Sequence, residues 1–400
     1  MLGWTIDDWR AAYRKKNVTP VSAMKALSAQ LQDSERALWI HLLDEASLLA
    51  QAERLSDPTL PLYGVPFAIK DNIDVGSLPT TAACPAYTYT AKETAPAVQA
   101  LLDAGAILVG KTNLDQLATG LVGVRSPYGE VPNPFNPDYI SGGSSAGSAA
   151  VVGLGLVPFA LGTDTAGSGR VPAAFTNTVG LKPTKGSMST RGVVPACRTL
   201  DCISVFALGV EDAQSVYDLF RGYDELDGYA RPAPTPLPSA LPERPRLGVP
   251  KDTPWFGDQQ AASAWQRHLE ELGEIAELIP LDTDVLKETA ELLYQGPWVA
   301  ERYTVAEPLL EKDALLPVIR DVILPAKQMS AADGFRAQYQ LADLRRRSDQ
   351  LMAEVDALVV PSTPGLYTRA AVAEEPVQLN RHPGTWTNLR HPPAMVSPAP

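Results

Sequence analysis

Histidine is scarce in this chain, which has only four among 400 residues. Because a catalytic serine ordinarily depends on a histidine base, this scarcity directs any serine chemistry toward a different base. Cysteine is scarcer still: Cys84, Cys197 and Cys202 cannot all pair, and none lies in a CxxC spacing. The sequence therefore argues against a disulfide framework and a zinc site, and favours three buried free thiols.

Positive charge and long apolar runs are also limited. Lysine and arginine number 34 against 46 acidic residues, a net charge of −12 that repels nucleic acids and anionic membrane surfaces. The N-terminus carries two acids within eight residues, unlike a secretory signal. The longest uncharged stretch, Tyr139 to Thr163, is interrupted by Gly, Ser and Pro. We therefore expect a cytoplasmic protein with no nucleic-acid or membrane partner.

Strand and helix patterns alternate through the first 220 residues. Thr5 to Asp8 and Thr19-Pro20 have the spacing of helix starts, and Val65 to Lys70 is typical of a short buried strand. Further helices are expected at 92–104, 148–156 and 211–220, and strands at 106–109, 157–161, 179–181 and 203–208. This alternation predicts an α/β fold with a largely parallel sheet.

A proline-rich segment divides the chain, because residues 231–245 contain six prolines and cannot form a core element. We predict one domain over 1–388, with a glycine-rich front half (1–222), a connection (223–245) and a helix-rich back half (246–388). An irregular tail (389–400) is expected to follow. Within the back half, strands are expected at 246–250 and 355–360, and helices at 261–272, 284–293 and 335–354.

Two short motifs match known patterns by letter but lack the structural context. Gly105 to Thr112 fits the phosphate-loop pattern GxxxxGK[ST], yet its intervening Ala-Ile-Leu-Val is itself the expected strand. Gly143 to Gly147 fits the nucleophile elbow GxSxG, with Ser145 as nucleophile. The segment before it contains three prolines and cannot supply the required strand. We therefore reject nucleotide binding and keep the elbow only as a rival site.

A better candidate lies in Thr163 to Arg170 (TDTAGSGR), which follows an expected strand and opens a helix. Unpaired backbone N–H groups at such a turn can hold an oxyanion beside Ser168. Lys70, at the end of an apolar strand, is the candidate base, since burial can lower a lysine pKa by roughly 3–5 units from about 10.4. The alternative is that Lys70 pairs with an acid such as Asp71 and that the glycines only form turns.

At this point the motifs resemble the amidase signature family: FAIKDNIDV (67–75), SGGSSAGSAA (141–150), GTDTAGSGRVPAA (162–174) and GLKPTKG (180–186) stand in order. The resemblance covers about residues 20–210. It implies the amidase signature fold, with a mixed, largely parallel central sheet flanked by helices on both faces. It also implies a Ser-cisSer-Lys triad of Ser168 as nucleophile, Ser144 as bridging serine and Lys70 as base.

The same resemblance implies an oxyanion hole, formed by the N–H groups of Thr165, Ala166, Gly167 and Ser168. Asp164 and Arg170 are expected to pair and to support this loop. Four segments are further similar to the allophanate hydrolase branch of the family: PLYGVPFAIKDNIDV, LPTTAACPAYTYT, KTNLDQLATGLVGVRSPYG and STRGVVPACRTLDCISVFAL. That branch implies cleavage of urea-1-carboxylate through a covalent acyl-enzyme, with release of ammonia and carbon dioxide in urea or triazine nitrogen catabolism. No metal or organic cofactor is expected.

The resemblance also implies that a small anionic amide substrate contacts Gly120, Tyr294 and Arg302, with the guanidinium binding its carboxylate. Pro297 lies between Tyr294 and Arg302 and argues against one regular helix. Without the resemblance, the alternative for Arg302 is a surface ion pair with a neighbouring glutamate, Glu301 or Glu307.

The resemblance also implies partners: a homodimer and a functional link to urea carboxylase. Relatives of this branch carry more sheet after the position of Asn388 and often a separate C-terminal domain. Here LRHPPAMVSPAP follows, so we expect the completed sheet and the second domain to be missing. The alternatives are another amidase of this family, an amidotransferase A subunit, and an inactive truncated fragment.

Overall fold

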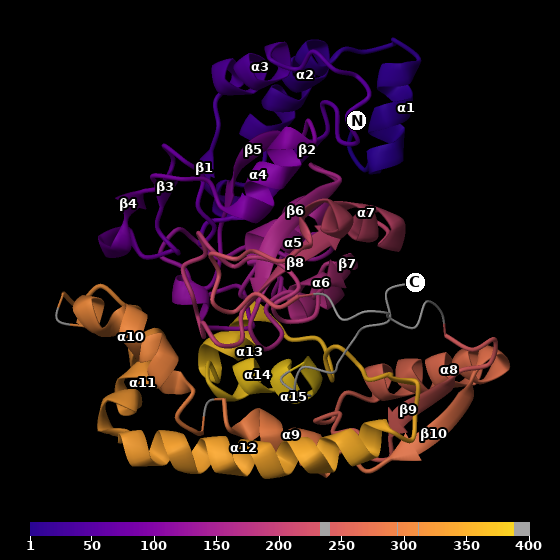
Figure 1. The fold of residues 1–400 in the computed structure, drawn as a ribbon, viewed down its shortest axis with the longest axis vertical. Helices are drawn as coiled ribbons and strands as arrows, with labels where there is room; N and C mark the ends of the chain where they lie inside the picture. The colour runs from indigo at the N-terminus through magenta and orange to yellow at the C-terminus, as the bar shows by residue number, and fades with distance from the viewer. Residues whose placement is uncertain (233–240, 294, 311, 388–400) are drawn as a thin grey trace.

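The computed structural model describes residues 1–232, 241–293, 295–310 and 312–387. A six-stranded sheet forms the centre of the front half (Figure 1). Its strands, in spatial order, are β1 (Trp39–Leu42), β5 (Ile107–Thr112), β2 (Pro66–Lys70), β6 (Phe159–Asp164), β8 (Cys202–Ala207) and β7 (Val179–Leu181). Within the described ranges, no helix has both the length and the apolar character needed to cross a membrane.

The central sheet is mixed. β2 pairs in parallel with β5 and with β6, whereas the β1–β5, β6–β8 and β8–β7 pairs are antiparallel. Consequently β2, β5, β6 and β7 run one way, and β1 and β8 run the other. The predicted α/β class with a mixed sheet is confirmed, with more antiparallel pairing than we expected.

Helices cover both faces of this sheet. They are α1 (Ile6–Arg14), α2 (Pro20–Gln32), α3 (Glu45–Glu53), α4 (Pro96–Asp103), α5 (Ala146–Gly153), α6 (Arg170–Phe175) and α7 (Val210–Phe220), with short 3-10 turns η1 (Arg36–Leu38), η2 (Pro85–Tyr87) and η3 (Gln116–Ala118). α5 packs across β5, β2, β6 and β8, and α7 packs against β8, β7 and α4. β2, β6 and β8 are buried along their whole length, as expected for strands covered on both faces.

The back half forms a second layer beneath the central sheet (Figure 1). Its three-stranded parallel sheet has the order β10 (Glu277–Leu281), β9 (Arg246–Pro250) and β11 (Ala357–Leu358). Its helices are α8 (Gln259–Ile275), α9 (Asp284–Glu291), α10 (Val299–Leu310), α11 (Pro317–Ile323), α12 (Ala331–Met352), α13 (Arg369–Glu374), α14 (Gln378–Arg381) and α15 (Gly384–Thr387), with the 3-10 turn η4 (Leu324–Gln328). A small hairpin of β3 (Pro79–Thr80) and β4 (Tyr89–Thr90) lies in the front half.

Most predicted elements are present, with the boundaries shifted by a few residues. The helix starts at Thr5 and Thr19 are confirmed, because each threonine side chain accepts a backbone N–H three residues on. The sequence pattern missed several elements, among them β1, α3, β10, α10 and α11. β1 has four residues and lies at the sheet edge, too short for its pattern to be decisive. The domain boundaries at 222, 245 and 388 stay predictions, and the irregular tail lies outside the described residues.

Candidate active site

Strand direction brings the candidate residues to one edge of the central sheet. The parallel strands β5, β2 and β6 end at this edge, which is the usual place for a site in such sheets. β2 ends with Lys70 and β6 ends with Asp164. β8 runs the opposite way and therefore begins here, with Cys202 opposite Asp164.

Lys70 is fully buried, and its amine contacts two hydroxyls. Its Nζ lies 2.8 Å from Ser144 Oγ and 2.7 Å from Thr163 Oγ1. Burial, with a smaller contribution from the charge of Arg302, lowers the pKa of Lys70 to about 7. The carboxylates of Asp115, Asp201 and Asp164 act in the opposite direction. An amine with this pKa can accept a proton from a serine hydroxyl near neutral pH.

Ser144 lies in the turn that precedes α5, and the Gly143–Ser144 peptide bond is cis. The glycine before it is required by space, because a Cβ on Gly143 would lie 2.2 Å from Asp115 Oδ2 and 2.7 Å from Gly123 N. The turn thus brings the Ser144 hydroxyl against Lys70.

The neighbouring serines, Ser145 and Ser148, form hydrogen bonds with the backbone of β6 instead. Ser145 Oγ donates to Thr163 O at 3.0 Å and accepts from Thr163 N at 3.2 Å, which ties the turn to β6. Ser148, inside α5, donates to Leu161 O at 2.9 Å. The strand that an elbow at Ser145 would need is absent, because the described residues 131–139 contain no strand. This geometry makes Ser145 a packing residue of the turn.

Ser168 lies between β6 and α6 and is 4% exposed. Its carbonyl oxygen accepts a hydrogen bond from Ser145 N at 3.2 Å, so the two serine-bearing loops are joined directly. Gly167, just before it, has φ of +137°, a conformation that side chains rarely adopt. The predicted context of Ser168, after a strand and before a helix, is confirmed.

Asp164 organises this loop. Its carboxylate accepts backbone N–H groups from Gly167, Gly169 and Arg170, and both of its oxygens bind the Arg170 guanidinium at 2.9 and 3.0 Å. Burial alone would raise the pKa of Asp164, but the charge and hydrogen bonds of Arg170 outweigh burial and lower the pKa. The expected Asp164–Arg170 pair is confirmed.

The alternative pairing of Lys70 with Asp71 is wrong. Asp71 instead forms a fully buried ion pair with Lys111, 3.0 Å from Asp71 Oδ1, and also accepts from the backbone and hydroxyl of Thr81. Lys111 donates further to Pro79 O and Thr80 Oγ1, both at 2.7 Å. The lysine of the phosphate-loop match is therefore occupied inside the protein, and the match itself is strand β5.

Arg302 lies in α10 and is buried, 3% exposed, so the alternative of a surface ion pair is wrong. Its Nη1 donates to Ala118 O at 3.2 Å and to Thr119 Oγ1 at 2.9 Å. Gly120 follows directly and is also buried, and a Cβ there would lie only 2.4 Å from Asp115 Oδ2. Tyr294 lies outside the described residues. α9 ends and α10 begins on either side of Pro297, as predicted.

Sequence reasoning missed the contacts of three residues at this edge, Thr163, Asn72 and Asp201. Thr163 contacts Lys70, and Asn72 Nδ2 donates to Thr163 Oγ1 at 3.3 Å. Asp201, directly before β8, accepts from Thr165 Oγ1 at 2.5 Å. The start of a strand antiparallel to β6 was the available signal for Asp201, but its direction is not readable from the sequence.

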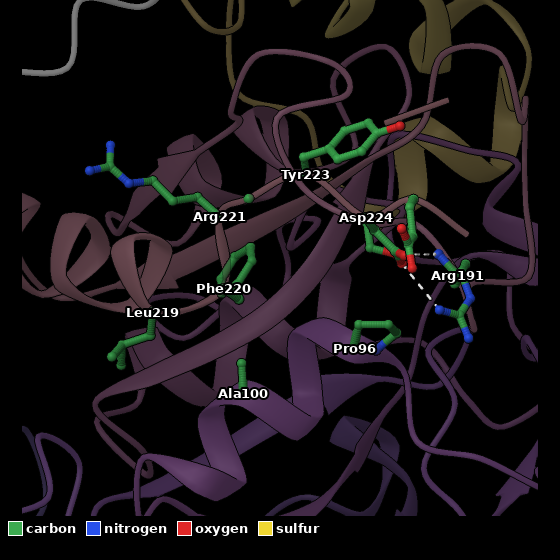
Figure 2. Close-up of a pocket in the computed structure, with 11 residues that line it drawn as sticks. Pro96, Ala100, Arg191, Leu219, Phe220, Arg221, Tyr223 and Asp224 are labelled. Carbon is green, nitrogen blue, oxygen red and sulfur yellow. Dashed lines mark hydrogen bonds and ion pairs between the residues drawn. The ribbon is translucent and has the colours of Figure 1, made fainter. Parts of the chain in front are cut away.

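All three cysteines are free and buried, as predicted. An open pocket of about 540 Å³ lies elsewhere, between α4 and the end of α7, and contains none of the predicted site residues. Figure 2 shows Arg191 in this pocket turned toward Asp224, to which it binds at 3.3 Å. The second arginine of the pocket, Arg221, is paired with Asp218 at 2.9 Å. Because both cations are already paired and the walls are open, this pocket has no features of the predicted site.

The fold and the site define an α/β protein in which a buried lysine faces a cis-linked serine at the carboxyl edge of the central sheet. A sequence profile of the family described as Amidase matches residues 22–399, and the chain belongs to this family. The predicted family is confirmed.

Two relatives resemble nearly all of this chain. The urea amidolyase of Lachancea kluyveri is 45% identical over 402 residues, which cover 97% of this chain and 22% of that protein. The structure of Kluyveromyces lactis allophanate hydrolase matches with a TM-score of 0.93 at 44% identity, over 97% of this chain and 65% of that one. The chain therefore spans less than a quarter of the urea amidolyase length.

A third relative matches a smaller part of this chain. The A subunit of the glutamyl-tRNA(Gln) amidotransferase from Methanosarcina acetivorans is 39% identical over 251 residues, which cover 61% of this chain and 52% of that protein.

Proposed function

We propose that this chain hydrolyses the terminal amide of allophanate, urea-1-carboxylate. The contact between Lys70 and Ser144 carries the proposal, because it joins a base of pKa about 7 to a hydroxyl beside the Ser168 loop. The similarity to urea amidolyase and to allophanate hydrolase supports this substrate.

In the first step, Ser168 Oγ attacks the terminal carbonyl carbon and passes its proton to Ser144, which passes its own to Lys70. The resulting oxyanion is stabilised by the N–H groups of Thr165, Ala166, Gly167 and Ser168. The C–N bond then breaks, and the leaving nitrogen takes the proton back through Ser144, so that ammonia departs and an acyl-enzyme remains.

In the second step, water attacks the acyl carbonyl and gives its proton to the same relay. Ser168 regains its proton, and the carboxylated carbamate leaves and loses carbon dioxide. Arg302 is the proposed partner of the substrate carboxylate, since its charge acts on Lys70 and its Nη1 faces Ala118 and Thr119, beside Gly120. Gly120 and Tyr294 stay proposed contacts.

Ammonia release from allophanate tests the proposal directly. We expect Ser168→Ala and Lys70→Ala to lower turnover by at least about a thousandfold, because residues of a relay act as a unit. A thermal melt with and without malonate, a dianionic mimic, reports binding independently. A stable wild-type chain that is not stabilised by malonate and releases no ammonia from allophanate would refute the substrate. Absence of a cooperative melt would instead favour the truncated-fragment alternative.

A second candidate is an amidotransferase A subunit, favoured by the 39% identity over 251 residues. Such a protein would need partner chains and a glutamyl-tRNA acceptor, so ammonia release by the isolated chain distinguishes the two. A homodimer, measurable by light scattering, and a functional link to urea carboxylase are proposed with the first function.

A further inference from the structure

The loop of residues 196–201, which we call the 196–201 loop, lies between the Ser168 loop and helix α10. Two carboxylates fix this loop. The buried Asp201 belongs to the loop itself and binds its first two residues, and Glu301 reaches Thr199, inside the loop, from α10. Neither carboxylate contacts a cation in the hydrogen bonds that the structure describes for it.

Asp201 connects the loop to the proposed oxyanion hole. Its Oδ1 accepts the hydroxyl of Thr165 at 2.5 Å and the backbone N–H of Cys197 at 3.2 Å, and its Oδ2 accepts the N–H of Ala196 at 2.9 Å. A carboxylate that accepts three hydrogen bonds in a buried place holds its donors firmly. The bond from its hydroxyl restrains the Thr165 side chain, at the start of the proposed oxyanion hole.

Glu301 connects the same loop to the helix that carries Arg302. One carboxylate oxygen accepts the Thr199 N–H at 2.9 Å, and the other accepts the Thr199 hydroxyl. Apolar packing runs alongside these bonds: Ala166, next to Thr165, belongs to one buried cluster with Cys197 and Trp298. The chain of contacts from α10 to the Ser168 loop is therefore continuous.

We propose that Asp201 and Glu301 are positioning residues that hold the oxyanion loop through the 196–201 loop. The proposal rests on the proposed function for its catalytic consequence. Because Glu301 and Arg302 are neighbours on α10, the helix proposed to bind the substrate carboxylate also fixes the N–H groups proposed to stabilise the transition state. The arrangement makes oxyanion stabilisation depend on the placement of α10.

Paired variants test this chain of contacts. Thr165→Val removes the hydroxyl that Asp201 binds, whereas Thr165→Ser keeps it. We expect Thr165→Val and Asp201→Asn to lower turnover by about 10²-fold, the scale for a misplaced oxyanion donor, and Thr165→Ser to lose at least about tenfold less than Thr165→Val because it keeps the hydroxyl. A merely structural effect of the lost methyl group would impair the serine variant too, and equal losses in Thr165→Val and Thr165→Ser would overturn the proposal.

Glu301→Gln is compared with Glu307→Gln, which changes an exposed glutamate two turns further along α10. We expect about a tenfold loss of turnover from Glu301→Gln alone, with malonate affinity within about threefold of the wild type because Arg302 stays in place. Equal activity of Glu301→Gln and Glu307→Gln would contradict the proposal.

Hydrogen exchange separates this proposal from the proposed function. Without substrate, peptides that contain residues 165–168 should exchange faster in Asp201→Asn and Glu301→Gln than in the wild type and in Glu307→Gln. If the wild type releases no ammonia from allophanate, the proposed function fails, and faster exchange still supports the positioning role. Unchanged exchange in both variants would overturn it.

Discussion

Lys70 shows how one side chain acquires its chemistry from burial. Its stem lies in β2, whose five residues are all buried, and its amine meets hydroxyls rather than a carboxylate. Desolvation disfavours the charged form, so the pKa falls to about 7 although three aspartates oppose the fall. In the proposed function, this lysine takes the place that histidine has in other serine enzymes.

The pH dependence of kcat/KM should follow the titration of the Lys70 amine. Because Lys70 accepts a proton only when neutral, we expect kcat/KM for allophanate to rise with pH and to level off above a midpoint near 7. Lys70→Arg should abolish the activity, since a guanidinium stays protonated. A rate that is flat between pH 6 and 8 would exclude Lys70 as the base.

Ser144 and Ser145 offer a contrast between neighbours. Ser144→Ala should lower ammonia release by at least about a thousandfold because it interrupts the relay. Ser145→Ala leaves the buried N–H and C=O of Thr163 without their partner, so we expect a loss of about 1–3 kcal/mol in stability but a smaller loss of turnover. The reverse order of activities would restore Ser145 as a nucleophile.

Asp164→Asn should destabilise the fold, because the partly buried Arg170 would lose its partner. We expect a loss of about 3 kcal/mol in the free energy of unfolding, measured with urea. The pKa of Asp164 is lower in the folded state than in the unfolded state. The stabilisation of the fold by the Asp164–Arg170 pair is therefore present above about pH 4 and is lost in stronger acid. Asp7→Asn, in an exposed pair with Arg10, is the control and should cost less than about 1 kcal/mol.

At the scale of elements, β2 and β6 determine the geometry of the site. They pair in parallel, with Phe67 opposite Phe159, and their rings stack with centroids 5.3 Å apart. Because both strands end at the same edge, their packing sets how close Lys70 comes to Thr163. The position of the polar groups at the ends of β2 and β6 therefore depends on the apolar packing between these strands.

Phe67→Ala tests this connection. We expect a loss of about 3–5 kcal/mol in stability, because a fully buried ring leaves a cavity between the strands. Phe135→Ala, at a 65% exposed position, should change the stability by no more than about 0.5 kcal/mol. Equal urea midpoints for the two variants would show that this stacking does not support the sheet.

At the scale of the whole molecule, the net charge of −12 argues against polyanionic ligands. The basic run at residues 345–347 lies on α12, and its Arg347 is paired with Glu288 at 2.8 Å. An exposed pair of this kind is typical of a solvated helix face.

Binding of tRNA therefore separates the two candidate functions. We expect no retention of tRNA in filter binding at about 0.15 M salt, because few phosphates could be neutralised. Salt-dependent binding that disappears when Arg345, Arg346 and Arg347 are changed to glutamine would support the amidotransferase alternative instead.

Local features of this protein follow from its sequence alone. The caps of α1 and α2, the buried run of β2 and the loop around Ser168 depend on residues a few positions apart, so their patterns are visible in the printed chain. Lys70 and Ser168 were predicted in this way, whereas Ser144 and the Asp164–Arg170 pair were predicted only with the family resemblance.

Only the tertiary structure decided which distant groups meet. The pairing of Asp71 with Lys111 and the bond from Thr165 to Asp201 join residues 36 or more positions apart. These contacts and the burial of Arg302 depend on strand order, strand direction and the docking of α10, each of which is set by packing over the whole core. The sequence therefore predicts the candidate reactive groups, whereas the fold determines which groups surround them and hence their pKa and orientation.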